Sequence, residues 1–484
     1  MRYSIIGGAY KGRSQTLDSQ ECYNAFIEID PKEKMKPIAL VRRPGLTVYN
    51  AIVAGEARGA YFASAAGIRF AVIGNTLYSF TDTAETVLGT LSTSSGQVFF
   101  ADNGVTPGGG NQVMLVDGAD GYIYNVSTAA FVNIETVAVD FPDAPQTVTF
   151  QDGYFIVNAG GTGRFYISDL YDGLSWNALD FATAEGDPDN LVAVKNDRRE
   201  LWLFGKRTTE IWYNSGDADF PFSRYQGGFF EMGCGAKGSV AKFDNSMVWL
   251  SASERGSRQF VRGVEGNATV LSTPSMSFQM AQYETVDDAR AYAFQIEGHE
   301  FYVCTFPTAE VTWVFDAVSQ EWFKWSYYDA GQHKQFRGAF YLFDGTNHIV
   351  LDHSNGSTYT LSGSVYADNG APMVLERIGT HLYFDGRRVQ VQSFELLMET
   401  GIGLTAGQGS APLVMLSWSK DGGHTYGSEI TRSIGAIGRY LTRAVWRKIC
   451  SSRDITFKVK ISDPVKVVIT GAYVMLRGEE NAKE

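Results

Sequence analysis

Three acidic residues close together are the first candidates for chemistry in this sequence. Glu185, Asp187 and Asp189 alternate with Gly186 and Pro188. Two carboxylates at such spacing could serve glycoside hydrolysis or calcium ligation. They could equally stabilise a turn through hydrogen bonds to backbone amides, since proline restricts the residue before it. We favour the turn, and predict neither a catalytic residue nor a bound metal ion here.

A second candidate lies near the C-terminus. The run SKDGGHTY contains Ser419, Asp421, Gly423 and Tyr426, and fits the Asp-box pattern S-x-D-x-G-x-T-[WFY] found in sialidase-type propellers. In that pattern the Ser and Asp side chains hydrogen-bond turn amides of a β-hairpin, and the aromatic ring packs beneath. Because the motif is structural even in enzymes, we predict a structural role for these four residues.

Histidines could build a metal site if their hairpins converged. His333, His348 and His353 lie near Asp344 and Asp352, and zinc takes such ligands. At turn edges, however, a solvated histidine is the simpler reading. The sequence has no G-x-S-x-G or Walker A pattern. We therefore predict a protein that is not an enzyme and needs no cofactor.

Arginines gather late in the chain. Arg439, Arg443 and Arg447 are spaced four residues apart, which would place them on one face of a helix. The neighbouring Val445-Trp446 and Ile449-Cys450 fit a strand equally well. These arginines are candidates for a charged interface between subunits, because the rest of the chain is acidic. A solvated face explains them as well, and the sequence leaves both readings open.

Short strands must position all of these residues. Apolar runs such as Leu201–Phe204 alternate with Asn-Gly and Asp-Gly turns, which favour antiparallel hairpins. Between about residues 50 and 365 this pattern recurs loosely, which predicts a β-propeller of six or seven irregular blades. Later segments are longer and alternate more regularly, which indicates a β-sandwich. The best helix candidate is residues 273–290.

We thus expect an all-β chain with three parts: an N-terminal segment (1–50) packing on the hub, a propeller-like domain (51–365) and a C-terminal β-sandwich (366–484). The length of 484 residues suits more than one domain, and 44% apolar content is typical of globular proteins. A formal charge of −12 argues against a broad nucleic-acid-binding surface. Four widely separated cysteines favour free thiols, as in a reducing cytoplasm.

The chain also resembles a known family, the tail-hub proteins of short-tailed bacteriophages (podoviruses), also called packaged-DNA-stabilisation or tail-nozzle proteins. The similarity is spread over short motifs whose order along the chain is the evidence. They are Tyr23-Asn24, Arg43-Pro44-Gly45-Leu46, Ser168-Asp169 with Trp176, Ala184 to Asp189, Leu203-Phe204-Gly205, Thr209-Glu210-Ile211-Trp212, and Leu416-Ser417 to Glu429.

This resemblance implies a structural protein of the virion tail, made in the host bacterial cytoplasm. Six copies would form a ring below the portal–adaptor (head-to-tail connector) protein and enclose the channel through which DNA leaves. The ring would help retain packaged DNA and would carry tailspikes or tail fibres, with a tail needle or plug as a further possible partner. The alternative is a propeller of a phage tail that binds or cleaves carbohydrate.

If six copies surround exiting double-stranded DNA, their inner wall should be neutral to acidic. Lysine and arginine contacts would release counterions and hold the duplex in place. Glu185, Asp187 and Asp189 are candidates for this wall, although an outer blade edge is an equally plausible place. The acidic balance of the chain could also reflect solubility alone.

Overall fold

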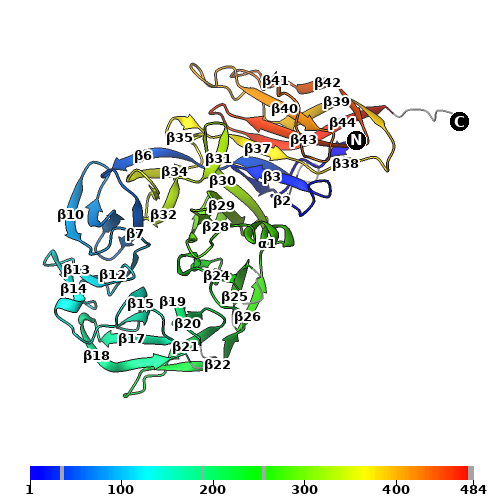
Figure 1. Ribbon diagram of the computed structural model, residues 1–484. Helices are drawn as coiled ribbons and strands as arrows, with labels where there is room; N and C mark the ends of the chain where they lie inside the picture. Colours follow the sequence, from blue (N-terminus) through cyan, green and yellow to red (C-terminus); the bar gives the residue numbers. More distant parts are fainter. Residues whose placement is uncertain (33–36, 185, 187–188, 253–257, 265, 478–484) are drawn as a thin grey trace.

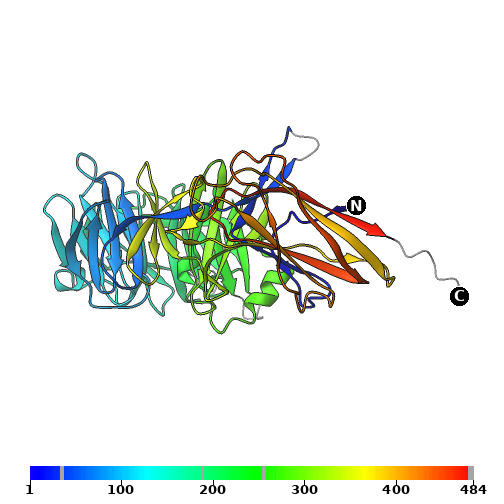
Figure 2. The same ribbon diagram turned by 90° about the horizontal axis from the view of Figure 1, so that it is seen from above.

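The computed structural model describes residues 1–32, 37–184, 186, 189–252, 258–264 and 266–477. Within these residues nearly all regular structure is β, in strands β1 to β44 with a single α-helix. The strands form a ring-shaped propeller beside a β-sandwich, and the two lie next to each other in both views (Figures 1 and 2).

Seven four-stranded blades make up the propeller, so the expectation of six or seven blades resolves to seven in the described chain. In each blade the strands are named from the innermost outwards. They are β7 (Ala57–Ala63), β8 (Ile68–Ile73), β9 (Thr76–Phe80) and β10 (Glu85–Thr90); β11 (Phe99–Asp102), β12 (Gln112–Val116), β13 (Gly121–Asn125) and β14 (Ala130–Asn133); β15 (Pro145–Gln151), β16 (Tyr154–Ala159), β17 (Arg164–Asp169) and β18 (Asp172–Thr183); β19 (Leu191–Asp197), β20 (Glu200–Gly205), β21 (Thr209–Asn214) and β22 (Phe222–Phe230); β23 (Ala241–Phe243), β24 (Ser246–Ala252), β25 (Arg258–Val264) and β26 (Asn267–Val270); β27 (Arg290–Ile296), β28 (His299–Phe306), β29 (Val311–Asp316) and β30 (Glu321–Asp329); and β32 (Gly338–Phe343), β33 (His348–Asp352), β34 (Ser357–Ser362) and β6 (Gly45–Ala51).

The seventh blade is completed by the N-terminal part of the chain. Strand β6 pairs antiparallel with β34, from Gly45 opposite Ser362 to Ala51 opposite Ser357. The ring is therefore closed by joining its first strand in sequence to its last hairpin. Two short strands, β35 (Ala367–Asp368) and β36 (Ala371–Pro372), extend the same sheet as the chain leaves the propeller.

The sandwich has two sheets, and one of them continues a blade. The first sheet contains β4 (Ala25–Ile29), β5 (Ile38–Arg42), β44 (Val468–Arg477), β39 (Val389–Met398) and β42 (Ala444–Ser452), with β1 (Arg2–Tyr3) on β44. The second contains β3 (Ser19–Tyr23), β37 (Leu375–Ile378), β43 (Asp454–Ile461), β40 (Leu413–Ser419) and β41 (Ile430–Ser433), with β2 (Tyr10–Lys11) on β3 and β38 (Leu382–Tyr383) on β43. Because β3 also pairs with β30, the sixth blade and this sheet are continuous.

Buried apolar side chains fill the spaces between neighbouring blades. Phe70 of the first blade and Leu115 of the second share one such cluster, and Trp202 and Trp249 join the fourth and fifth blades in another. A larger core runs from the sixth blade into the sandwich. Alternating strand residues thus serve both faces of each blade, as sheet-on-sheet packing requires.

Aspartates at strand ends stabilise the turns of the propeller. Asp117 accepts hydrogen bonds from the amides of Ala119 and Asp120, and Asp316 does the same for Val318 and Ser319. Such Asx turns let the chain reverse within a few residues.

The remaining regular elements are short. They are β31 (Gln332–Gln335), the 3-10 turns η1 (Ile134–Thr136) and η2 (Lys237–Ser239), and the helix α1 (Pro274–Met280). The helix begins after its cap Thr273 but covers less than half of the expected 273–290. No helix in the described ranges is long and apolar enough to cross a membrane.

Candidate functional site

The junction between propeller and sandwich is built around a buried ion pair. Arg43 and Asp368 have no exposed side-chain surface, and their Nη2 and Oδ2 atoms lie 2.7 Å apart. Arg43 also donates to the carbonyl oxygens of Ser326, on the sixth blade, and of Pro44. One guanidinium therefore joins the N-terminal segment, a blade and the segment that leaves the propeller.

Asn24 completes this junction. Its Oδ1 accepts hydrogen bonds from Arg43 Nε and from the Ser326 amide, both at 2.8 Å, and its Nδ2 donates to the Val374 carbonyl. Asn24 has a φ of 58°, a conformation that asparagine tolerates better than most residues. Next to it, a Cβ on Gly45 would lie 2.4 Å from the Val365 carbonyl oxygen, so the backbones approach too closely for a side chain.

The preceding arginine points into the sandwich instead. Arg42 donates to the carbonyl oxygens of Ile461, Asp463 and Val465 at 2.6–2.9 Å. Burial, and then the charge of Arg43, lower its pKa to about 10. The pair Arg42-Arg43 thus fixes the end of β5 to both domains.

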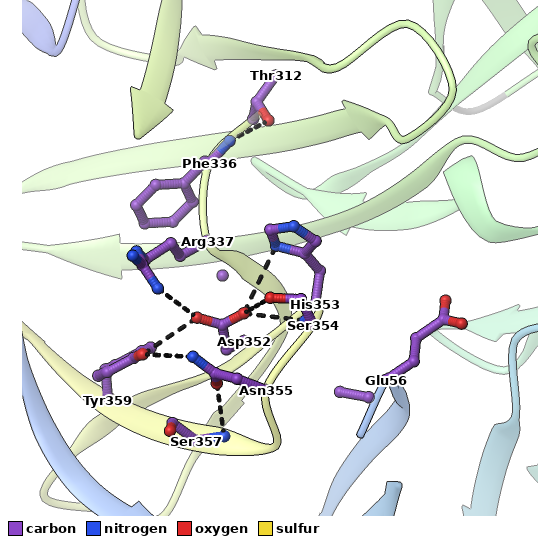
Figure 3. A network of polar contacts seen from close by, with 12 residues as sticks. Glu56, Thr312, Phe336, Arg337, Asp352, His353, Ser354, Asn355, Ser357 and Tyr359 are labelled. Atoms are coloured by element: carbon purple, nitrogen blue, oxygen red, sulfur yellow. Dashed lines mark hydrogen bonds and ion pairs between the residues drawn. The ribbon is translucent and has the colours of Figure 1, made fainter. Parts of the chain in front are cut away.

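A second polar network lies in the seventh blade (Figure 3). The buried carboxylate of Asp352 accepts hydrogen bonds from Arg337 Nη1 and the Tyr359 hydroxyl, each at 3.0 Å, and from the Ser354 amide at 2.9 Å. Figure 3 also shows His353 beside this carboxylate, 3.6 Å away. Every oxygen of Asp352 is occupied by residues of the blade, so the network locks the β33–β34 turn.

The three histidines do not form a common metal site. His333 stacks on Tyr23 at the junction, whereas His348 accepts from or donates to the Tyr341 hydroxyl within the seventh blade. Among the described residues no cluster of three or more His, Cys, Asp or Glu is arranged to hold a metal ion.

The Asp-box-like run forms a tight turn after β40. Asp421 accepts hydrogen bonds from the Ser419 hydroxyl and from the amide and hydroxyl of Thr425, and the Gly423 amide donates to Ser419. These bonds hold the pKa of Asp421 below its usual range. The ring of Tyr426 packs under Lys458, whose Nζ lies 4.5 Å from the ring centre. In this geometry the side-chain oxygens of Ser419 and Asp421 accept hydrogen bonds from the turn itself.

The arginine cluster lies at the edge of the sandwich, not on a helix. Arg439 and Arg443 are in the exposed loop before β42, and Arg447 is on β42, the last strand of its sheet. Arg443 forms two hydrogen bonds with Glu395, at 2.7 and 2.8 Å. Arg439 and Arg447 point into solvent.

Exposed apolar side chains accompany these arginines. Ile437, Tyr440 and Leu441 lie in the same loop, and Leu441 is 96% exposed. A large apolar side chain so fully exposed beside unpaired arginines is typical of a protein–protein contact.

Of the acidic loop, only Asp189 among its three acids can be placed; Glu185 and Asp187 lie outside the described residues. Asp189 Oδ2 accepts hydrogen bonds from the amides of Arg207 and Thr208, at 2.5 and 3.1 Å. This carboxylate therefore caps the turn between β20 and β21.

Charge is divided unequally between the two domains. Residues 1–374 contain 26 Lys and Arg against 42 Asp and Glu, a formal charge of −16. Residues 375–477 contain 14 Lys and Arg against 8 Asp and Glu, a formal charge of +6. Strands β1 to β5 of residues 1–44 belong to the sandwich, and this segment carries 8 Lys and Arg against 5 Asp and Glu. The propeller therefore has a formal charge of −19 and the sandwich one of +9.

Comparison with known families decides between the readings of this architecture. The family model described as "Bacteriophage P22 Gp10, beta-propeller" matches residues 1–366, and the one described as "Bacteriophage P22 Gp10, beta-sandwich" matches residues 375–477. The chain belongs to the tail-hub family of short-tailed bacteriophages. Members of this family are structural proteins of the virion tail, so the junction and the basic loop are parts of a tail component.

Other comparisons found similarity only at low sequence identity. No curated protein matches the chain. The β-propeller domain of Cps50 (Swd1) from Myceliophteria thermophila is 8% identical, with a TM-score of 0.43 over 66% of this chain and 99% of that one. PorZ, a surface component of the type-IX secretion system of Porphyromonas gingivalis, is 11% identical, with a TM-score of 0.38 over 72% of this chain and 44% of that one.

For this tail-hub protein, reasoning from sequence missed the junction. The motif residues Asn24, Arg43 and Gly45 were noted, but their partner Asp368 is more than 300 positions away. The Arg-Pro-Gly run between two apolar strands was a local signal of this junction, because such a run is unusual for a solvated surface.

Proposed function

We propose that this protein is the hub of a short phage tail, with six copies arranged as a ring below the portal–adaptor protein. The observation that carries the proposal is that two family models together match nearly the whole chain, in one order. The ring would form the DNA exit channel, help to retain packaged DNA and hold tailspikes or fibres, with a needle or plug as a further partner. The subunits would be made in the host cytoplasm.

The division of charge supports contacts between neighbouring copies. A sandwich of +9 beside a propeller of −19 favours heterologous contact, in which one copy's sandwich meets the next copy's propeller. Such head-to-tail contacts generate a closed ring when the rotation between copies divides a full circle. The exposed Leu441 loop, with Arg439 and Arg447, is the part of the sandwich best suited to that contact.

DNA would pass between the copies and not through a propeller. The cavity at the propeller axis has a volume of about 540 Å³. A DNA duplex, whose major groove alone is about 12 Å wide, is far too large to pass through it. The channel wall would therefore come from outer surfaces of the chain.

Electron microscopy of the purified protein mixed with its adaptor tests the proposal. A six-fold ring bound to the adaptor is the expected result. Particles that remain single subunits at saturating adaptor, or rings of another symmetry, would contradict the hexameric hub.

A further inference from the structure

The central cavity of the propeller is lined by lysines in an otherwise acidic chain. Residues from the innermost strands of all seven blades line this space of about 540 Å³. Its charged lining residues are Lys195, Lys237, Lys242 and Asp102. The local charge is therefore positive, opposite in sign to the −16 of residues 1–374.

Asp102 does not neutralise these lysines. Its carboxylate accepts hydrogen bonds from the Tyr61 hydroxyl and the Gly104 amide, on the side of the first two blades. Lys237 donates to Gln146 Oε1 at 2.9 Å, and Lys242 lies 3.5 Å from Asp197. Two of the three lysines thus have partners within the protein.

Lys195 has none among the described residues. It lies in the middle of β19, half-buried, where its neighbours Ala193 and Val194 are packed into the cores between blades. Burial, and then the charge of Lys242, lower its pKa to about 8. No acidic group offsets either effect, so the ammonium is held in the cavity without a counter-charge. An ammonium in such surroundings is costly unless it is paired.

We propose that the propeller cavity binds a small oxyanion, which Lys195 contacts directly and Lys242 attracts from the neighbouring blade. The Lys195 ammonium and a polar cavity suit a phosphate-like or carboxylate group, since charged hydrogen bonds between ammonium and oxyanion are the strong ones. Lys242, which is already paired with Asp197, contributes less. The site lies within one chain, so it does not depend on ring formation or on the proposed place in the tail.

Titration calorimetry of the full-length protein tests the site. Inorganic phosphate is titrated at pH 7 and constant ionic strength, and acetate in a parallel series separates phosphate-like from carboxylate ligands. Calorimetry is preferable to thermal melting, because phosphate stabilises folded proteins without binding them. The variants are Lys195→Met, Lys242→Met and, as a control with the same loss of charge, Lys420→Met on the exposed turn after β40.

We expect saturable binding of one of the two anions by the unmodified protein and by Lys420→Met. Binding should weaken roughly tenfold or more in Lys195→Met, because a hydrogen bond to a charged group is removed. Lys242→Met should weaken it less. No saturable heat with either anion, or equal binding by Lys195→Met and Lys420→Met, would overturn the proposal.

Chemical labelling gives a second readout that needs no variant. At pH 8 a large fraction of Lys195 is neutral and nucleophilic, whereas exposed lysines, with pKa values near 10.4, are almost fully charged. Acetylation of Lys195, followed by peptide mass spectrometry, should therefore be fast and should slow as the bound anion is added. Labelling of Lys195 that is unaffected by the anion would place the anion elsewhere.

Discussion

The buried guanidinium of Arg43 holds several distant segments of the chain together. Its four hydrogen bonds reach three separate parts of the chain, and among the described residues its counter-charge is Asp368. Removing one partner of a buried ion pair leaves the other as an uncompensated charge, which costs far more than the loss of a surface pair.

We expect Arg43→Met to lower the free energy of unfolding by about 3–5 kcal/mol. The control is Arg443→Met, which removes a solvated pair with Glu395 and should lower the free energy of unfolding far less, because exposed ion pairs contribute little. Urea unfolding followed by tryptophan fluorescence measures both. If Arg43→Met does not fold, Asp368→Asn provides the same test from the other partner. Equal losses for the buried and the solvated pair would contradict this reading of the junction.

His299 is a second residue that ties the N-terminal segment to a blade. Its ring lies between Asp316 and Glu28, at 3.0 and 3.1 Å. Burial lowers the pKa of His299, but hydrogen bonds to Asp316 and Glu28 and their charges outweigh it and raise the pKa above its ordinary value.

Stability should therefore depend on pH through His299. A folded-state pKa above the unfolded value of about 6.5 means that the contribution is full below that pH and is lost as pH rises through the folded pKa. His299→Gln should remove this part of the pH dependence, and His424→Gln, at an exposed turn, should keep it. Urea midpoints measured from pH 5.5 to 9 would show the difference; parallel curves for both variants would rule it out.

At the scale of elements, strand β6 depends on glycine where it enters the seventh blade. A Cβ at Gly45 would lie 2.4 Å and 2.7 Å from the carbonyl oxygens of Val365 and Ala367. Because both atoms belong to backbone, neither can move without disturbing β6 or β35.

Gly45→Ala should cost about 1–3 kcal/mol, the usual range for overpacking. Gly427→Ala is the matched control, since its nearest atom would be 3.9 Å away and its φ is ordinary. The thermal unfolding midpoint should fall clearly for the first variant and little for the second. A similar midpoint for both would mean that the backbone at β6 relaxes freely.

The strands themselves could be predicted from local sequence, but the distant strands with which they pair could not. The run Leu201–Phe204, the turn before it and the strand Thr209–Tyr213 are where alternation and turn residues place them. Nothing local indicates that residues 45–51 pair with residues 357–362, or that β3 joins a blade to the sandwich, because strand partners are chosen by packing across the whole fold. The expected helix 273–290 was too long. Residues 281–289 contain some apolar side chains, but they have neither a helix cap nor a steady helical period.

The same distinction between local and distant partners decided which candidate sites could be predicted. Asp421 and Ser419 lie in one short turn, so their hydrogen bonds could be anticipated from the pattern alone. The lysines of the cavity could not, because Lys195 and Lys242 come from different blades and meet only when the fourth and fifth blades pack against each other. Lys195 left no separate signal, because it reads as the first residue of the charged turn 195–200.

For the whole molecule, the division of charge predicts that the proposed assembly is sensitive to salt. We expect the purified chain to be largely monomeric and to form a hexamer on the adaptor, with less hexamer at high salt. The attraction between basic sandwich and acidic propeller shortens in range as the Debye length falls from about 10 Å at 0.1 M to about 3 Å at 1 M.

Light scattering coupled to size exclusion at both salt concentrations measures this assembly. Replacing Arg439 and Arg447 together by Gln should reduce the hexamer at 0.1 M, and Arg387→Gln with Arg388→Gln is a control with the same loss of charge. A salt-insensitive dimer as the final state would count against the proposed contacts.

The late closure of the propeller also governs how the chain can be made. During synthesis the first six blades emerge in order, and each can form from strands close in sequence. The seventh cannot, because β34 emerges some 300 residues after its partner β6, and β1 must wait for β44. Until then the nascent chain carries an open ring and an unpaired strand edge, which can bind other chains. We therefore expect that a subunit becomes competent for assembly only after β44 has been synthesised.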